Sequence, residues 1–95
     1  DVPTTFDVTI LAEKDGQFDY GDVPFTGQDL RSALNYRKEE GLPMDTVLLK
    51  RSEKQSVKDA HVVWIARLSV DLKFKAYVGE DGEINEIQTT TKKSD

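Results

Sequence analysis

The fold of this chain is decided by residues 56–68, SVKDAHVVWIARL, which fit two different patterns. As a helix, the segment begins at 56–59 with a polar capping sequence that can bond the first free backbone amides. Its side chains then recur at the spacing of one helix face, which predicts a stripe directed at a core. That stripe consists of Val57, Ala60, His61, Trp64 and Leu68.

The same residues also fit a long strand, because every second residue from Val62 to Val78 is apolar. Strict alternation favours a strand with one buried face and one solvated face. A strand of that length exceeds the usual range of about 3–10 residues, and the best point for a break is Ser69-Val70-Asp71. We therefore predict a helix over about 56–68 and a strand over 72–78, with an all-strand meander over 61–87 as the alternative.

A β-hairpin is predicted at the start of the chain. Residues 6–10, FDVTI, alternate apolar and polar side chains and favour a half-buried strand that extends to about Ala12. Asp15-Gly16 follows, and this pair readily adopts the positive φ of a tight hairpin turn. Residues 17–20, QFDY, then alternate again and form the returning strand.

A helix is predicted over 27–40. Thr26 can accept hydrogen bonds from the first backbone amides, while Asp29 at the third helical position complements the positive end of the helix dipole. Gly41 ends the helix, because glycine adopts the left-handed conformation of a helix terminus without steric cost. The predicted core stripe comprises Leu30, Ala33, Leu34 and the aliphatic part of Arg37.

The remaining segments complete an α+β fold. Residues 45–51 contain the run TVLL, which predicts a strand covered on both faces. A turn at 79–82 leads to a weaker strand at 83–87. We expect a mixed sheet of four to five strands with both helices on one face, in the order strand, strand, helix, strand, helix, strand and a further strand. Residues 1–88 are predicted as one domain and 89–95 as a disordered tail.

Composition narrows the classes of function. The 95 residues include no cysteine, which excludes disulfides and thiolate metal ligands. The net charge of −5 argues against nucleic-acid binding, which requires a basic surface. The longest apolar run, at 62–66, is far shorter than the roughly 20 residues of a membrane-spanning helix.

Basic residues are concentrated in the middle of the chain, whereas both flanking segments are acidic. A run of charge is commonly a solvated surface, and a patch that faces a protein partner is the alternative. The candidate partner-binding residues are Lys50, Arg51, Lys54, Lys73 and Lys75.

The groups needed for catalysis are scarce. The chain has one histidine and no glycine-rich phosphate loop, so we expect no enzyme, no cofactor and no metal site. His61 lies among apolar residues and is predicted to be a buried, hydrogen-bonded side chain rather than a general base. Asp15, Asp19 and Asp22 approach the spacing of a calcium loop, but the glycines are displaced and Thr26 occupies the position of the bidentate glutamate.

Aromatic side chains predict further packing. Trp64 is the single tryptophan, and its large apolar area favours a role as a core anchor. Phe18, Tyr20 and Phe25 are predicted to cluster where the hairpin meets the helix at 27–40.

Short motifs occur in a recognisable order: VTI at 8–10, DG at 15–16, GDVPFT at 21–26 before Leu30 and Leu34, DTVLL at 45–49 and SV at 56–57. In this order they resemble the periplasmic domain of the ExbD/TolR biopolymer-transport family, over about residues 6–78. Two positions depart from the family pattern. Arg51-Ser52 stands where the family usually has an aspartate, and Leu68-Ser69 where it usually has Ala-Gly.

The resemblance implies a non-catalytic module of a proton-driven energy-transduction complex. Such a domain is periplasmic or extracellular, forms a homodimer, and contacts an energy-transducing protein partner or the cell wall. The ion-conducting aspartate of the family lies in a transmembrane helix that this chain does not include. The resemblance therefore implies membrane attachment only through such a segment. It assigns no proton-transfer role to any residue of this chain.

A strand with unpaired backbone groups would be a natural docking edge. Lys73 and Lys75 are alternatively expected to protect that edge against unwanted pairing. The all-strand pattern over 61–87 leads to a different class, a cystatin-like or PepSY-like secreted module that binds a peptide or inhibits an enzyme.

Overall fold

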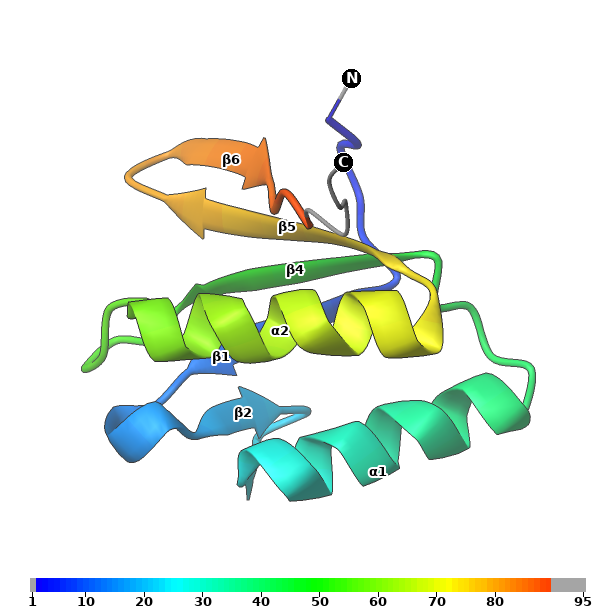
Figure 1. Cartoon of the computed structure of the whole chain (residues 1–95). Coiled ribbons are helices and arrows are strands. Elements are labelled where there is room, and N and C mark those ends of the chain that lie inside the picture. The colour runs from blue at the N-terminus through cyan, green and yellow to red at the C-terminus, as the bar shows by residue number, and fades with distance from the viewer. Residues whose placement is uncertain (1, 90–95) are drawn as a thin grey trace, which may run out of the picture.

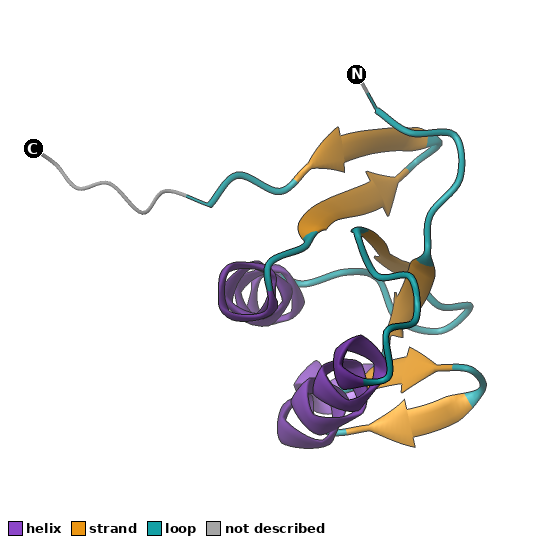
Figure 2. Ribbon diagram, turned by 90° about the vertical axis from the view of Figure 1, so that its right-hand side faces the viewer, coloured by secondary structure: helices purple, strands orange, loops and turns teal. Residues whose placement is uncertain are grey.

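The computed structural model describes residues 2–89 and contains a six-stranded sheet with two helices against one of its faces (Figures 1 and 2). The strand order across the sheet is β3-β2-β1-β4-β5-β6. The α+β class and the position of both helices are therefore confirmed, while the sheet is larger than predicted. The elements are β1 (Val8–Ala12), the short 3₁₀ turn η1 (Lys14–Gly16), β2 (Phe18–Tyr20), β3 (Val23–Phe25), α1 (Gly27–Glu39), β4 (Thr46–Arg51), α2 (Asp59–Leu72), β5 (Lys75–Glu80) and β6 (Glu83–Glu86).

Three parallel strands form the centre of the sheet. β4 lies between β1 and β5, with Val8 opposite Val47 and Thr46 opposite Lys75. Antiparallel pairs extend the sheet on both sides, through β2 and β3 at one side and through β6 at the other. Residues 47–49 are all buried, as the TVLL run predicted, because a central parallel strand is covered on both faces.

Helix α2 resolves the ambiguity of the segment that decides the fold. It begins at Asp59 rather than Ser56 and ends at Leu72 rather than Leu68, so it runs through the predicted break. The all-strand pattern over 61–87 is therefore wrong, and the cystatin-like or PepSY-like alternative loses its structural basis. The buried residues of α2 recur at helical spacing and are His61, Ile65, Leu68, Ser69 and Leu72.

The start of α2 is capped differently from the prediction. Lys58, not Ser56, is the N-cap residue, and its backbone N–H donates to Nδ1 of His61 at 3.0 Å. The side chain at the third helical position thus satisfies the amide that precedes the helix, which is one half of a capping box.

The predicted core stripe of α2 is rotated about the helix axis. His61 and Leu68 are buried as predicted, but Ala60 is exposed and Trp64 is only half-buried. Ile65, which the predicted stripe omitted, is fully buried. The sequence pattern could not separate the two sides of this helix because apolar residues occur on both.

Strand β5 begins at Lys75 rather than Leu72. Leu72 ends α2, and Lys73 adopts the left-handed conformation that closes the helix, with φ of 64°. Lys73 and Lys75 therefore do not share a strand. β5 also pairs with β4 and β6 on its two sides, so these lysines do not protect a sheet edge as expected.

Helix α1 follows its prediction closely. Thr26 caps it, because its Oγ1 accepts a hydrogen bond from the backbone N–H of Asp29 at 3.1 Å. The helix ends at Glu39, and Gly41 adopts a φ of 75° just beyond it. Its buried residues are Leu30 and Leu34.

The opening hairpin carries one strand more than predicted. The turn between β1 and β2 is the 3₁₀ turn η1, in which Asp15 and Gly16 have φ of 58° and 71°. Val23-Pro24-Phe25, for which no strand was predicted, forms β3 and pairs with β2. Three residues around a proline give little sequence signal for a strand, because proline is confined to sheet edges.

One hydrophobic core lies between the sheet and the helices. Its side chains come from the helix-facing side of the strands and from both helices, and Ile87 joins it directly after β6. The strand predicted at 83–87 is thus present as β6. The tail predicted at 89–95 lies outside the described residues, apart from residue 89.

Candidate protein-binding site

The two edges of the sheet differ in their capacity to pair with another strand. β3, at one edge, has Pro24 at its centre, and proline offers no backbone N–H to a further strand. β6, at the other edge, contains no proline, and no strand within residues 2–89 pairs with its outer side (Figure 1). In the described part of the chain, β6 is therefore the edge that is open to addition of a strand.

The outward backbone groups of β6 belong to Ile84 and Glu86. Ile87 donates its N–H to the carbonyl of Ala76 at 2.8 Å, so the backbone of Ile87 faces β5. Because backbone groups alternate in direction along an antiparallel strand, those of Ile84 and Glu86 point away from β5. Each of these residues presents one N–H and one C=O at the edge.

A groove of about 400 Å³ lies beside this edge. Gly79 forms its floor, because a residue without a side chain leaves an opening between Leu48 and Ile84. A Cβ at position 79 would lie 3.6 Å from Leu48 Cδ1 and 3.7 Å from Ile84 Cγ1, which are ordinary contact distances. The groove is an apolar slot of side-chain width, rimmed by bases of β4 and by acids of the turn at 80–83.

Carboxylates are concentrated around the groove and the strand edge. Glu80 and Glu83 are direct cross-strand partners, and like charges in that position oppose strand pairing. Neither forms an ion pair within residues 2–89. Bases on an added strand would relieve this repulsion. The carboxylates are those of Glu80, Asp81, Glu83 and Glu86.

The bases that the sequence singled out do not form one patch. Lys50 and Arg51 lie at the carboxyl end of β4 and line the groove, and Lys54 follows in the next loop. Lys73 and Lys75 lie at the opposite end of the parallel strands, because Lys75 is paired with the first residue of β4. The parallel register thus brings Lys50 and Arg51 to the candidate site and separates the other pair from it.

Sequence reasoning missed the acidic side of the site. The turn at 79–82 and the strand at 83–87 were both predicted, but nothing local indicated that this strand would lie at an edge. Edge position depends on the order of all six strands. The usable signal was the sequence EDGE at 80–83, which places acids on both sides of a turn without a base.

His61 has a structural role, in agreement with its prediction. Its Nδ1 accepts the N–H of Lys58 and so carries no proton, and its Nε2–H donates to the carbonyl of Glu13 at 2.8 Å. The residue is 1% exposed and packs edge-on against Phe18, with 5.3 Å between ring centroids. Both ring nitrogens are thus engaged by the backbone.

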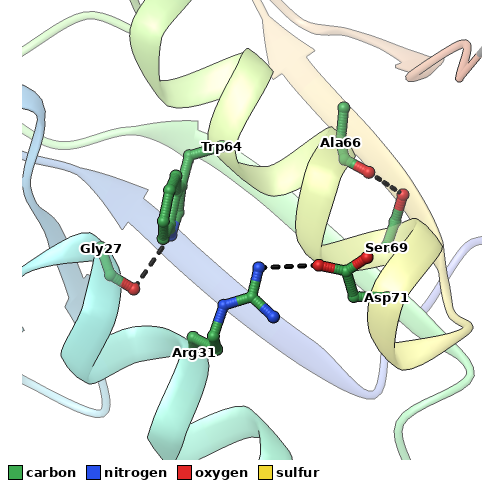
Figure 3. Close-up of polar contacts among 6 residues, drawn as sticks. All are labelled: Gly27, Arg31, Trp64, Ala66, Ser69 and Asp71. Atoms are coloured by element: carbon green, nitrogen blue, oxygen red, sulfur yellow. Dashed lines mark hydrogen bonds and ion pairs between the residues drawn. The ribbon is translucent and has the colours of Figure 1, made fainter.

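Trp64 is half-buried and packs against the core, so it is less buried than predicted, and it also joins the two helices (Figure 3). Its Nε1–H donates to the carbonyl of Gly27 at 2.9 Å. The guanidinium carbons of Arg31 and Arg67 lie 5.7 and 5.9 Å from the ring centroid. Arg31 also forms an ion pair of 2.7 Å with Asp71. These contacts fasten the start of α1 to the middle and end of α2.

The predicted aromatic cluster is divided between the core and the surface. Phe18 packs against His61, whereas Tyr20 and Phe25 lie together with 6.0 Å between ring centroids. The latter two line a second groove, of about 570 Å³, beside α1. Arg37 in that groove already contacts the hydroxyl of Tyr20, at 3.5 Å. The guanidinium of Arg37 is therefore engaged by intramolecular contacts.

The comparisons with known proteins give no information on this site, so its interpretation rests on its geometry. No family model, curated protein or solved structure was found to match this chain. Within residues 2–89, His, Asp and Glu side chains do not gather in groups of three or more that could hold a metal ion. No helix in this range is long and apolar enough to cross a membrane.

Proposed function

We propose that this chain is a non-catalytic protein-binding module that adds an extended segment of a partner protein to the edge of β6. The observation that carries the proposal is the unpaired backbone of Ile84 and Glu86 beside the groove at Gly79. An extended peptide gains affinity from main-chain hydrogen bonds to such an edge. Pockets for alternate side chains provide specificity.

The partner segment is expected to alternate apolar and basic side chains. Ile84 projects on the groove side of the sheet, whereas Glu83 projects on the other side together with its cross-strand partner Glu80. An added strand would therefore place apolar side chains beside Ile84 and basic side chains beside Glu83. The same acids oppose the pairing of β6 with a second copy of itself.

The resemblance to the ExbD/TolR family supports the same class of function. The periplasmic domain of that family is a partner-binding module beside a proton-driven motor. We therefore take the partner to be a protein of an energy-transduction complex that reaches the domain in an extended conformation.

Peptide titration tests this proposal. A short peptide of alternating lysine and valine is added to the isotopically labelled chain, and backbone amide shifts are followed by NMR. Shifts are expected at Ile84 and Glu86, whose amides should also become protected from hydrogen exchange as they gain partners. Two control peptides should bind at least about tenfold more weakly. One alternates glutamate and valine, and the other has the lysines and the valines in separate blocks.

Three variants separate the edge from the groove. Glu86→Pro removes an outward N–H without breaking the ladder to β5, and should abolish binding, whereas Glu86→Gln keeps that N–H and should retain part of it. Gly79→Val fills the groove with a side chain suited to a strand and should weaken binding. Full binding by Glu86→Pro, or equal binding of the three peptides, would exclude strand addition at β6.

A further inference from the structure

The second groove, of about 570 Å³, lies at the end of the sheet away from β6, between helix α1 and the strands β2 and β3 (Figure 1). We call it the α1 groove. Its apolar lining consists of Tyr20 from β2, Phe25 from β3, Ala33 and Tyr36 from α1, and Leu42 after the helix. Three of these five side chains are aromatic, and aromatic residues are enriched where proteins contact their partners.

The walls of the α1 groove are open to solvent. Tyr36 is 63% exposed and Leu42 is 49% exposed, although both are large apolar side chains. A site for a small molecule usually buries about 70–90% or more of its ligand. Walls as exposed as these do not enclose a small molecule to that extent. The α1 groove is therefore suited to an elongated segment of a larger partner.

The edge of the sheet beside the α1 groove is closed to strand addition. β3 is the edge strand, and Pro24 at its centre has no backbone N–H to donate to a further strand. A partner segment at this end of the sheet is thus held by side chains of the groove and not by a backbone ladder.

Hydroxyl groups are the hydrogen-bond donors that the α1 groove offers to a partner. The Tyr20 oxygen accepts a contact from Nη1 of Arg37 at 3.5 Å, so its own hydrogen remains free to donate. Ser32 and Tyr36 also line the groove and are exposed. A partner helix has little use for such donors, because its carbonyls are bonded within the helix. The carbonyls of a polyproline II segment are all free, so the donors favour this conformation.

The length and the rings of the α1 groove fit the same conformation. The lining residues of α1 run from Asp29 to Arg37, which spans about 12 Å at 1.5 Å per residue. A polyproline II segment rises about 3.1 Å per residue, so about four residues occupy the groove, and residues three apart lie on the same side. Tyr20 and Phe25 lie together, with 6.0 Å between ring centroids. Grooves lined by aromatic rings are the usual docking sites of proline-rich segments.

Asp29 provides the free charge of the α1 groove. Arg37, at the other end of the lining, donates its Nε–H to the carbonyl of Pro43 at 2.9 Å in addition to its contact with Tyr20. Asp29 is exposed and forms no ion pair within residues 2–89. The groove is therefore complementary to a partner segment that carries a base next to its apolar residues, with the base at the end where α1 begins.

We propose that the α1 groove binds a proline-rich segment of a partner protein in the polyproline II conformation. Prolines three positions apart pack against the aromatic rings, the hydroxyl groups donate to carbonyls of the segment, and an arginine or lysine beside the prolines pairs with Asp29. The α1 groove shares no lining residue with the groove beside β6. The proposal goes beyond the proposed function and stands or falls separately from it.

Peptide titration followed by NMR tests the proposal. The probe is a ten-residue peptide with prolines three positions apart and an arginine at each end, which allows either direction of binding. Amide shifts are expected at Asp29, Tyr36 and Leu42, whereas Ile84 and Glu86 should not respond. A control peptide with alanine in place of every proline should bind at least about tenfold more weakly, because it lacks the preformed extended conformation. This control favours a helix, so equal or tighter binding of it would overturn the proposal.

Substitutions on α1 separate the ring from the hydroxyl. Tyr36→Ala should raise the dissociation constant of the proline-rich peptide at least about tenfold. Tyr36→Phe keeps the ring and removes one donor, so it should raise the constant about two- to fivefold. Asn35→Ala is the matched control, since Asn35 is exposed on the same helix but does not line the groove, and it should bind normally. Circular dichroism verifies that each variant is folded.

A charge exchange tests the pairing with Asp29. Asp29→Lys should bind the arginine peptide about three- to tenfold more weakly and should instead prefer a peptide with glutamate in place of arginine. Unchanged preference in this variant, or full binding by Tyr36→Ala, would overturn the proposal. So would shifts of the groove amides that depend on protein concentration without peptide, because they would assign the α1 groove to a second copy of the chain.

Discussion

The indole of Trp64 donates its Nε1–H to the carbonyl of Gly27 at 2.9 Å, so the middle of α2 is joined to the first turn of α1. The approach is so close that a Cβ at position 27 would lie 2.8 Å from the indole ring. Position 27 therefore requires glycine for space, since its backbone conformation is helical.

Gly27→Ala is expected to destabilise the fold by about 1–3 kcal/mol, the usual effect of overpacking. The sign is informative because alanine is the better helix former, and helix propensity alone would predict stabilisation. Urea unfolding measures the change. Trp64→Leu in the same chain should reduce the cost of Gly27→Ala, and an equal cost in both backgrounds would exclude a clash with the indole.

His61→Phe keeps an aromatic ring of similar size but removes both ring nitrogens. The N–H of Lys58 and the carbonyl of Glu13 then lose their partners, which should lower the free energy of unfolding by about 2–4 kcal/mol. Nitrogen NMR of the wild-type ring should show the neutral form with the proton on Nε2. A proton on Nδ1 would contradict the assigned hydrogen bonds.

Asp71→Asn removes the ion pair with Arg31, but it should cost less than about 1 kcal/mol. The two side chains are 33% and 44% exposed, so water and salt screen the charges. Denaturation at low and at high ionic strength measures the difference, which should shrink as salt is added. A large cost that is independent of salt would indicate a packing role for Asp71.

Lys73→Gly should stabilise the fold by about 0.5–1 kcal/mol, because a non-glycine residue pays for the left-handed conformation at φ of 64°. Lys75→Gly is the control and should destabilise, since Lys75 lies in an extended strand. Thermal unfolding of the two variants measures the difference, and destabilisation by Lys73→Gly would contradict a cost of the left-handed conformation at this position.

Pro24→Val should convert the closed edge of the sheet into an open one. Valine restores a backbone N–H at the centre of β3 and favours the strand conformation, so the fold should be retained. We expect increased aggregation in light scattering, because an unprotected edge templates further pairing. Unchanged solubility over a long incubation would show that Pro24 does not protect this edge.

Local chemistry made much of the fold predictable from sequence. Helix α1 was placed to within one residue because Thr26 and Gly41 act within one turn of it. The run TVLL likewise identified β4 as a strand covered on both faces. Each of these signals depends on only a few neighbouring residues, so the rest of the chain does not change it.

Local sequence patterns were not sufficient to assign helix α2. Its outer side carries Val63 and Val70 in addition to the core residues, so alternation and helical spacing were both satisfied. Its cap is His61, which is held by the carbonyl of Glu13 from 48 positions away. No window of sequence contains both residues.

The sequence by itself determined the α+β class of the domain, helix α1 and the opening hairpin. Only the tertiary structure decided which strand lies at an open edge, and which charges meet there. Parallel pairing of β1, β4 and β5 carried Lys50 and Arg51 to the groove at Gly79 and Lys75 to the other end of the sheet. Strand order and register bring together residues that are distant in the chain. Burial of the whole hydrophobic core fixes both the strand order and the register.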